Sequence, residues 1–248
     1  MGHDPFERMH TGADTIVVFS HGFIGSPGQF EDLADLAYQN GCAVLSLLLP
    51  GHGGTAKEFT KFGLADWESH LESELQRVSS VYENIILVGH SMGGLLSLNA
   101  SLNKDFNIKG VLLISSPLKL RYSLRTLLLG IKLALFPKST NEILTAYRNS
   151  NSVVRASIFT YALWLKQTGD VYKLMSKTKS NLPDITVPTT ILLSKKDETV
   201  SLKSANIFHA GLQNASKKLI ILSDSQHAFY VPQERDIIGR ELLQLINC

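Results

Sequence analysis

Six short runs of apolar residues, rich in β-branched side chains and bounded by turn residues, recur along the chain. Segments with apolar residues three and four positions apart separate several of them, such as 30–37 and 71–78. Strands that alternate with helices predict the α/β class with a doubly wound, mostly parallel sheet, in which ligands bind beyond the carboxyl ends of the strands. The predicted strands are Thr15–Phe19, Ala43–Leu49, Asn84–Val88, Gly110–Ile114, Thr189–Leu193 and Lys218–Leu222.

The alternation stops between residues 117 and 181, where helical patterns occur without a convincing strand. We therefore expect a core formed by residues 1–116 and 182–248, with a helical lid, residues 117–181, inserted into it. The lid carries eleven Lys or Arg residues against two acids, Glu142 and Asp170. A solvated helix face accounts for this excess most simply, and attraction of anionic substrates or of a membrane surface is the alternative.

Charge and cysteine content argue against several classes of protein. A formal net charge of +2 is too small to indicate nucleic-acid binding. The two cysteines, Cys42 and Cys248, predict neither a disulfide framework nor a zinc site. The first residues include acids and a proline where a signal peptide has a basic flank and an apolar core. We therefore expect a cytoplasmic protein without a metal.

The most apolar stretch, residues 124–136, bears on membrane association. Arg125 and Lys132 interrupt it, and it is too short to cross a bilayer of about 30 Å as a helix. No stable membrane insertion is expected, although the basic lid is compatible with peripheral contact with lipid. The sequence leaves the oligomeric state open.

The strand predicted at Asn84–Val88 runs directly into Gly89-His90-Ser91-Met92-Gly93, and a helical pattern follows. A G-x-S-x-G turn between a strand and a helix holds its serine in a strained conformation, with the hydroxyl exposed above the sheet. Ser91 is therefore the candidate nucleophile. An ordinary glycine-rich turn with an incidental serine is the alternative, and the surrounding motifs must decide between the two.

The loop Ser20-His21-Gly22-Phe23 follows the first predicted strand, where this architecture supplies one of the two amides of an oxyanion hole. The backbone amides of Phe23 and Met92 are the expected donors. His21 itself is a candidate base, but its place beside Gly22 favours a role in loop structure.

Asp197 and His227 follow the last two predicted strands. A serine hydroxyl needs a histidine base, and that histidine needs a carboxylate to orient it. The chain order Ser91, Asp197, His227 is the one expected for this architecture. His52 is a rival base because it too follows a strand, although it precedes Ser91. Two rival acids remain open, Glu198 beside Asp197 and Asp224 in a turn before His227.

These motifs together resemble the α/β-hydrolase superfamily, in particular its small bacterial carboxylesterases and monoacylglycerol-lipase-like members. The resemblance spans nearly the whole chain. One departure is that only about fourteen residues precede Thr15, so we expect a shortened sheet edge. The motifs are His21-Gly22-Phe23, Leu49-Pro50-Gly51-His52-Gly53, Asp66-Trp67, Gly89-His90-Ser91-Met92-Gly93-Gly94, Asp197-Glu198, Ser204-Ala205-Asn206 and His227.

The resemblance implies an acyl-enzyme mechanism without a cofactor, and a small-molecule ester as substrate. Phe23, His90, Leu128 and Phe136 are the candidate substrate contacts, and packing of the lid onto the core is the alternative account of the lid's apolar residues. A thioesterase or acyltransferase would use the same residues. A non-catalytic binding protein on this fold is the alternative of another class.

Overall fold

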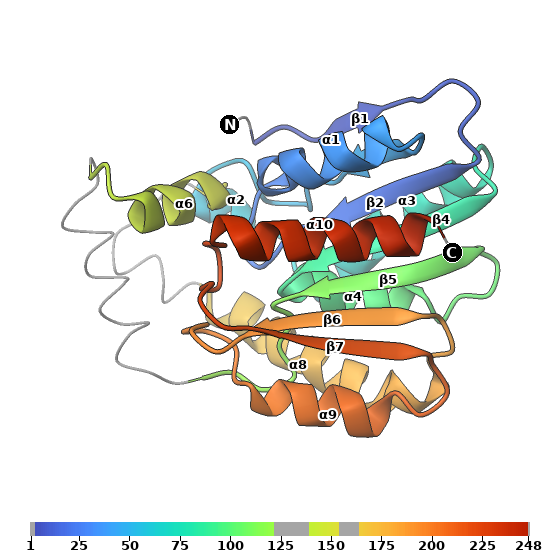
Figure 1. Ribbon diagram of the computed structural model, residues 1–248. Coiled ribbons are helices and arrows are strands. Elements are labelled where there is room, and N and C mark those ends of the chain that lie inside the picture. Colours follow the sequence, from blue (N-terminus) through green and yellow to red (C-terminus); the bar gives the residue numbers. More distant parts are fainter. Residues whose placement is uncertain (1–2, 122–138, 154–163, 248) are drawn as a thin grey trace.

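The computed structural model describes residues 3–121, 139–153 and 164–247 (Figure 1). They contain a seven-stranded sheet in the order β1-β3-β2-β4-β5-β6-β7. All six predicted strands are present and pair in parallel, whereas β1 runs antiparallel to β3. The strands are β1 (Phe6–Arg8), β2 (Thr15–Ser20), β3 (Ala43–Ser46), β4 (Asn84–His90), β5 (Ile108–Ile114), β6 (Thr189–Ser194) and β7 (Lys217–Leu222).

Helices cover both faces of the sheet (Figure 1). Apolar residues of α1 and α10 pack on one face, and those of α3, α4, α8 and α9 pack on the other. The helices are α1 (Glu31–Gln39), α2 (Ala56–Phe59), α3 (Leu64–Ser79), α4 (Met92–Ala100), α6 (Glu142–Ser150), α8 (Leu165–Asn181), α9 (Lys203–Gly211) and α10 (Pro232–Ile246), with short 3₁₀ turns η1 (Pro27–Phe30) and η2 (Leu182–Asp184).

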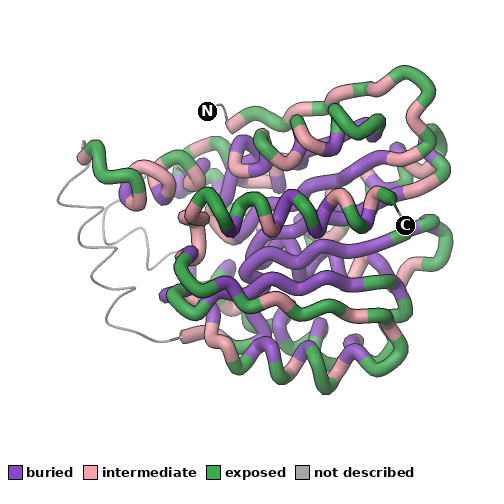
Figure 2. The backbone as a smooth tube through the Cα atoms, viewed as in Figure 1, coloured by how far each residue is buried: buried purple, intermediate pink, exposed green. Residues whose placement is uncertain are grey.

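The central strands are buried on both faces (Figure 2). Side chains alternate along a strand, so Ile16 and Val18 of β2 enter one apolar core while Val17 and Phe19 enter the other. This double burial explains why the strands appear in the sequence as continuous apolar runs. It leaves the loops at their carboxyl ends as the place where polar side chains converge.

The two edge strands of the sheet are less buried than its centre. The residues before Thr15 form a short edge strand, the three-residue β1, whose Glu7 accepts two hydrogen bonds from Arg77 of α3, at 2.9 and 3.1 Å. Strand β7, predicted as buried, is largely exposed, and Leu219 and Ile221 are each 37% exposed. An edge strand has a neighbour on one side only, and β7 lies at the end of the sheet.

Part of the region predicted as a lid lies within the described residues. Helix α8 packs against α3 and α4, with Leu174 fully buried in the same core as the central strands. Helix α6 lies beside the carboxyl ends of the strands (Figure 1). The boundaries of the lid, residues 117 and 181, stay a prediction. No helix in the described ranges combines the length and apolar character needed to cross a bilayer.

Candidate active site

Ser91 occupies the turn between β4 and α4 in a strained backbone conformation, with φ of 53° and ψ of −120°. Non-glycine residues rarely adopt a positive φ, and such strain is concentrated at functional sites. Ser91 immediately precedes the first residue of α4, so the first amides of the helix, including that of Met92, have no partner within the helix. The local geometry is the strand–turn–helix predicted for the candidate nucleophile.

Glycine is required at the turn because the backbone of neighbouring segments passes very close. A methyl group at Gly89 would lie 2.3 Å from Gly94 Cα, and one at Gly93 would lie 2.0 Å from the carbonyl oxygen of Ser20. The Ser20 contact joins the turn to the carboxyl end of β2. Close approach thus brings the Ser91 turn against the loop that begins after β2.

Gly93→Ala is expected to destabilise the protein by about 3 kcal/mol or more, because the methyl group would strike two backbone carbonyl oxygens that have no side-chain freedom. Chemical denaturation measures the effect. Gly169→Ala in α8 is the matched control, since nothing lies within 4 Å of its added methyl group, and a gain of roughly 0.5 kcal/mol is expected there. Equal stabilities for the two variants would contradict the tight turn.

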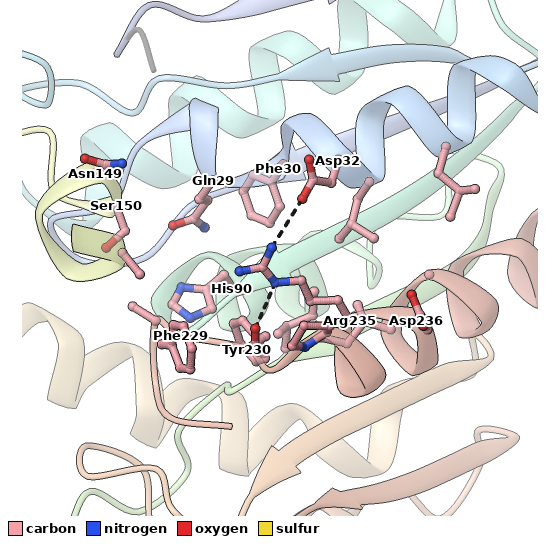
Figure 3. A pocket seen from close by; sticks show the side chains of 18 of the residues that line it. Gln29, Phe30, Asp32, His90, Asn149, Ser150, Phe229, Tyr230, Arg235 and Asp236 are labelled. Carbon is pink, nitrogen blue, oxygen red and sulfur yellow. Dashed lines mark hydrogen bonds and ion pairs between the residues drawn. The ribbon is translucent and has the colours of Figure 1, made fainter. Parts of the chain in front are cut away.

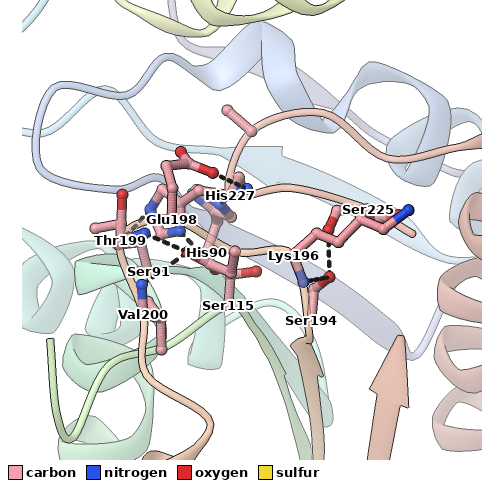
Figure 4. A network of polar contacts seen from close by, with 12 residues as sticks. His90, Ser91, Ser115, Ser194, Lys196, Glu198, Thr199, Val200, Ser225 and His227 are labelled. Atoms are coloured by element: carbon pink, nitrogen blue, oxygen red, sulfur yellow. Dashed lines mark hydrogen bonds and ion pairs between the residues drawn. The ribbon is translucent and has the colours of Figure 1, made fainter. Parts of the chain in front are cut away.

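The structure brings Ser91, Asp197 and His227 together at the carboxyl ends of β4, β6 and β7. Figure 4 shows Ser91 and His227 side by side at this edge of the sheet. Ser91 Oγ lies 3.1 Å from His227 Nε2, and His227 Nδ1 lies 2.9 Å from Asp197 Oδ2. The Asp197 side chain is 1% exposed and that of His227 is 14% exposed. These contacts form a continuous path for a proton from the serine hydroxyl to an imidazole held by a carboxylate.

The backbone completes the environment of the Asp197 carboxylate. Asp197 Oδ1 accepts hydrogen bonds from the amides of Thr199 at 2.8 Å and Val200 at 2.7 Å. Burial acts to raise the pKa of Asp197, but the charge and hydrogen bond of His227, together with these amides, outweigh it and lower the pKa below its usual value. The carboxylate is therefore ionised at neutral pH.

The pKa of the His227 imidazole is shifted upward, opposite to that of Asp197. Burial acts to lower the pKa of His227, but the charge and hydrogen bond of Asp197, with a contribution from the charge of Glu198, raise it above its usual value. The raised pKa means that the imidazolium form is favoured next to Asp197. A base of this kind stabilises the proton that it accepts.

The loop after β2 lies beside Ser91, as an oxyanion hole requires. A methyl group at Gly22 would be 3.1 Å from Ser91 Cβ. Among the described residues, nothing accepts a hydrogen bond from the amide of Phe23. The Phe23 ring packs edge-on against Phe59, with centroids 5.3 Å apart, in a cluster that also holds Trp67. The cluster fixes the position of the loop.

The rival bases have structural roles. His21 Nε2 accepts a hydrogen bond from the amide of Leu49, while its Nδ1 lies 2.9 Å from the carbonyl oxygen of Gly22. Both ring nitrogens of His52 face backbone carbonyl oxygens, with Nε2 2.7 Å from the oxygen of Phe23. These two rings link the loop after β2 to the loop after β3. The histidine whose ring contacts the Ser91 hydroxyl is His227.

The two rival acids, Asp224 and Glu198, differ in burial. Asp224 lies at the surface, 58% exposed, and pairs with Lys196 at 2.6 Å. It is not in contact with the His227 ring. Glu198 is buried near His227, and its Oε2 accepts a weak hydrogen bond from the backbone amide of His227 at 3.4 Å. The carboxylate that contacts the imidazole ring is that of Asp197.

Sequence reasoning missed the residues that hold the backbone of His227. The carbonyl oxygen of His227 accepts hydrogen bonds from Tyr230 Oη at 3.0 Å and His90 Nε2 at 2.9 Å. Ser115, with φ of 50°, contacts the Tyr230 hydroxyl at 3.0 Å. Burial lowers the pKa of His90 to about 3, so its ring is neutral and donates through Nε2. The proximity of Tyr230 and His227 in sequence was the only available signal.

A second missed residue is Glu234 in the first turn of α10. Its carboxylate accepts hydrogen bonds from the backbone amides of Ser223 at 2.6 Å and Ser225 at 2.8 Å, and from the Ser225 hydroxyl at close range. Ser194, at the end of β6, also donates to the Ser225 carbonyl oxygen. The turn before His227 is thereby tied to β6 and α10. An acid in the first helical turn was the sequence signal for this role.

A cavity of about 990 Å³ lies between η1, α1, α6 and α10 (Figure 3). His90 and Ala228, the chain neighbours of Ser91 and His227, line it, together with apolar residues such as Phe30. Of the four predicted substrate contacts, His90 therefore lines a cavity, and the ring of Phe23 packs against Phe59 and Trp67. Leu128 and Phe136 lie outside the described residues.

No group of three or more histidine, cysteine, aspartate or glutamate side chains that could hold a metal occurs in the described part of the chain. The convergent groups of the site are a hydroxyl, an imidazole, a carboxylate and backbone amides. This set can carry out acyl transfer through a serine.

Comparison with known proteins relates most of the chain to hydrolases. The family described as "Serine aminopeptidase, S33" matches residues 11–234. A thermostable monoacylglycerol lipase of Bacillus sp. (strain H-257) is 25% identical, over 98% of this chain and 94% of its own. A carboxylesterase of Bacillus subtilis (strain 168) is 24% identical, over 95% and 94%. The solved structure of a metagenome-derived lipolytic enzyme superimposes with a TM-score of 0.77 at 21% identity, over 100% and 98%.

Proposed function

Because the chain belongs to the serine aminopeptidase S33 family of α/β hydrolases, we propose that it hydrolyses carboxylic esters through an acyl-enzyme on Ser91. The family confirms the predicted fold and the prediction of a serine hydrolase. The observation that carries the proposal is the contact of 3.1 Å between Ser91 Oγ and His227 Nε2 in a turn with positive φ. The names of the two Bacillus relatives support an ester as substrate.

In the proposed mechanism, His227 Nε2 takes the proton of the Ser91 hydroxyl as Oγ attacks the ester carbonyl carbon. The carbonyl π electrons move to the oxygen, and the amides of Phe23 and Met92 stabilise this oxyanion. One such donor is worth roughly 3–4 kcal/mol in the transition state. The tetrahedral intermediate then expels the alcohol, which takes the proton from His227. Asp197 stays ionised throughout and stabilises the imidazolium.

The acyl-enzyme is hydrolysed by the same groups. His227 removes a proton from water as the water oxygen attacks the acyl carbon, and Ser91 leaves as the proton returns to its oxygen. The products are a carboxylic acid and the free enzyme. No step requires a cofactor.

The rate is expected to rise with pH in a range set by His227. The base must be neutral to accept the serine proton, and the pKa of His227 is raised above its usual value by Asp197 despite burial. The ascending limb of the kcat/KM profile is therefore expected to have its midpoint above about 6.5. Initial rates between pH 5 and 9 measure it. A midpoint well below 6.5 would contradict the ionised Asp197 beside His227.

A substrate panel tests the proposed reaction. Nitrophenyl esters from acetyl to palmitoyl, a monoacylglycerol, a matched thioester and an amino-acid nitroanilide are compared with the same enzyme. Hydrolysis of oxyesters in preference to the thioester and the anilide is expected, with small to medium acyl groups favoured. Preferred thioester cleavage would indicate the alternative thioesterase, and transfer to an added alcohol in preference to water would indicate an acyltransferase.

A binding protein without catalytic activity is the alternative of another class. It predicts that none of the panel is turned over and that a fluorophosphonate probe fails to label the protein. The hydrogen bond between Ser91 and His227 argues against this alternative. The strained backbone at Ser91 also argues against it, because such strain costs free energy of folding and is concentrated at functional sites.

A cytoplasmic location, and peripheral contact of the basic residues 117–181 with lipid, remain predictions from composition. Association with anionic liposomes that is lost at high salt would support the lipid contact. Equal sedimentation with anionic and neutral liposomes would contradict it.

A further inference from the structure

Helix α6 and the residues after it form polar contacts with two separate loops of the site. We call residues 142–153 the α6 segment. Near the middle of it, Tyr147 is 8% exposed, and its hydroxyl donates a hydrogen bond to Glu198 Oε1. The same hydroxyl oxygen accepts from the amide of Ala228 at 3.4 Å. Tyr147 therefore contacts both the loop after β6 and the loop that carries His227.

At its carboxyl-terminal end, the α6 segment contacts the loop that carries Phe23. The amide of Ser152 donates to the carbonyl oxygen of Ile24 at 3.0 Å, and the Ser152 hydroxyl donates to the carbonyl oxygen of Gly25 at close range. Ser152 is 2% exposed. One short segment thus joins the base side of the site to the expected oxyanion side.

The hydrogen bond from Tyr147 holds a buried carboxylate, that of Glu198. Glu198 is 4% exposed and directly follows Asp197 in the chain. A buried carboxylate is costly unless hydrogen bonds hold it. Burial, followed by the charge of Glu198, raises the pKa of Tyr147, so its hydroxyl is protonated and available as a donor at neutral pH. Glu198 Oε2 in turn faces the amide of His227.

We propose that Tyr147 is a positioning residue that acts through Glu198 to hold the loop of His227 in its reactive geometry, an inference that rests on the proposed function. Tyr147 does not touch the reacting atoms. Its hydroxyl and the Glu198 carboxylate connect α6 to the backbone of the base, while Ser152 connects the same segment to the oxyanion loop. The α6 segment thereby sets the spacing between the base and the expected oxyanion donors.

Other residues of α6 line a cavity next to the site. Thr145, Ala146, Asn149 and Ser150 line the cavity of about 990 Å³ that reaches His90 and Ala228 (Figure 3). A ligand in this cavity touches the helix that carries Tyr147. Loss of the Tyr147 hydroxyl is expected to reduce kcat more than it changes KM, because its contacts with Glu198 and Ala228 order the base and do not bind the ester.

Several groups around His227 govern its titration. Asp197 contacts the ring at Nδ1, Ser91 lies at Nε2, and the rings of His90 and His227 have centroids 4.9 Å apart. The charge of Glu198 raises the pKa of His227. The His90 ring is neutral, because burial lowers its pKa. Removal of the Glu198 charge alone is therefore expected to move the titration of His227 to lower pH.

The test compares Tyr147→Phe and Glu198→Gln with Tyr38→Phe, which removes a hydroxyl from an exposed tyrosine of α1. Tyr147→Phe is expected to lower kcat for a chromogenic ester about 10-fold, with KM within about twofold. Glu198→Gln keeps an acceptor for Tyr147 and is expected to move the acid limb of kcat/KM to lower pH, because the charge of Glu198 raises the pKa of His227. Tyr38→Phe is expected to match the wild type in both.

An NMR titration of the His227 ring in the same variants provides a readout that does not depend on activity. A titration midpoint lowered in Glu198→Gln, and a His227 resonance broadened in Tyr147→Phe, are the expected results. Wild-type kcat, acid limb and His227 resonance in Tyr147→Phe would overturn the proposal. Absence of ester hydrolysis by the wild type would instead overturn the proposed function, and the NMR comparison would still test the positioning role.

Discussion

Asparagine in place of Asp197 is expected to lower kcat for ester hydrolysis by about 10⁴-fold. The carboxylate accepts the Nδ1 proton of His227 at 2.9 Å, so it selects the tautomer whose Nε2 faces Ser91. An amide in the same place can donate to Nδ1 and favour the wrong tautomer. Steady-state kinetics with a soluble chromogenic ester, measured above the acid limb, detect the loss.

Asp224→Asn is the matched control for the acid. Its carboxylate is exposed and pairs with Lys196 at the surface, so kcat within about twofold of the wild type is expected. Thermal unfolding of both variants separates a catalytic loss from a loss of folded protein. Retained activity in Asp197→Asn together with a large loss in Asp224→Asn would show that the acid had been assigned wrongly.

Alanine in place of Ser91, or of His227, is expected to lower kcat by about 10⁶-fold. The two side chains act as a unit through one hydrogen bond of 3.1 Å, so the double variant is expected to be no slower than either single variant. Rates are followed with concentrated enzyme over long times. Ser91 is 8% exposed and the substitution removes only its hydroxyl, so the fold should persist.

A loss in the double variant equal to the product of the two single losses would contradict this unit. So would a Ser91→Ala variant with substantial activity, which would indicate direct attack by water with His227 as the base. His52→Ala is a poor control because its ring holds the carbonyl oxygen of Phe23. His209→Ala, on the exposed face of α9, is the suitable one, and wild-type kinetics are expected for it.

The strands were predictable because burial on both faces leaves a strong local pattern. Val17 and Phe19 enter one core while Ile16 and Val18 enter the other, so every position of the run is apolar. Strand β1 was missed because it has three residues, Phe6–Arg8, and depends on pairing with β3. The exposure of β7 was missed because position in the sheet is not a local property.

Some residues of the site were likewise predictable from local sequence, and others were not. Ser91 was predictable because its turn is encoded by adjacent residues, and the loops of Asp197 and His227 follow strands in a parallel sheet, whose carboxyl ends meet at one edge. Asp197 and Asp224 differ in burial, which sequence reasoning could only infer from position. One partner of Glu198 is Tyr147, which lies 51 residues away in the predicted insertion, and no local pattern joins the two.

Identification of a covalent acyl group on the protein distinguishes attack by Ser91 from direct attack by water. The protein is quenched with acid during turnover of a slowly deacylating ester, and its mass and proteolytic peptides are measured. One added acyl group is expected, located on Ser91 and absent from the Ser91→Ala variant. Continued hydrolysis without any adduct, or an acyl group on another residue, would contradict attack by Ser91.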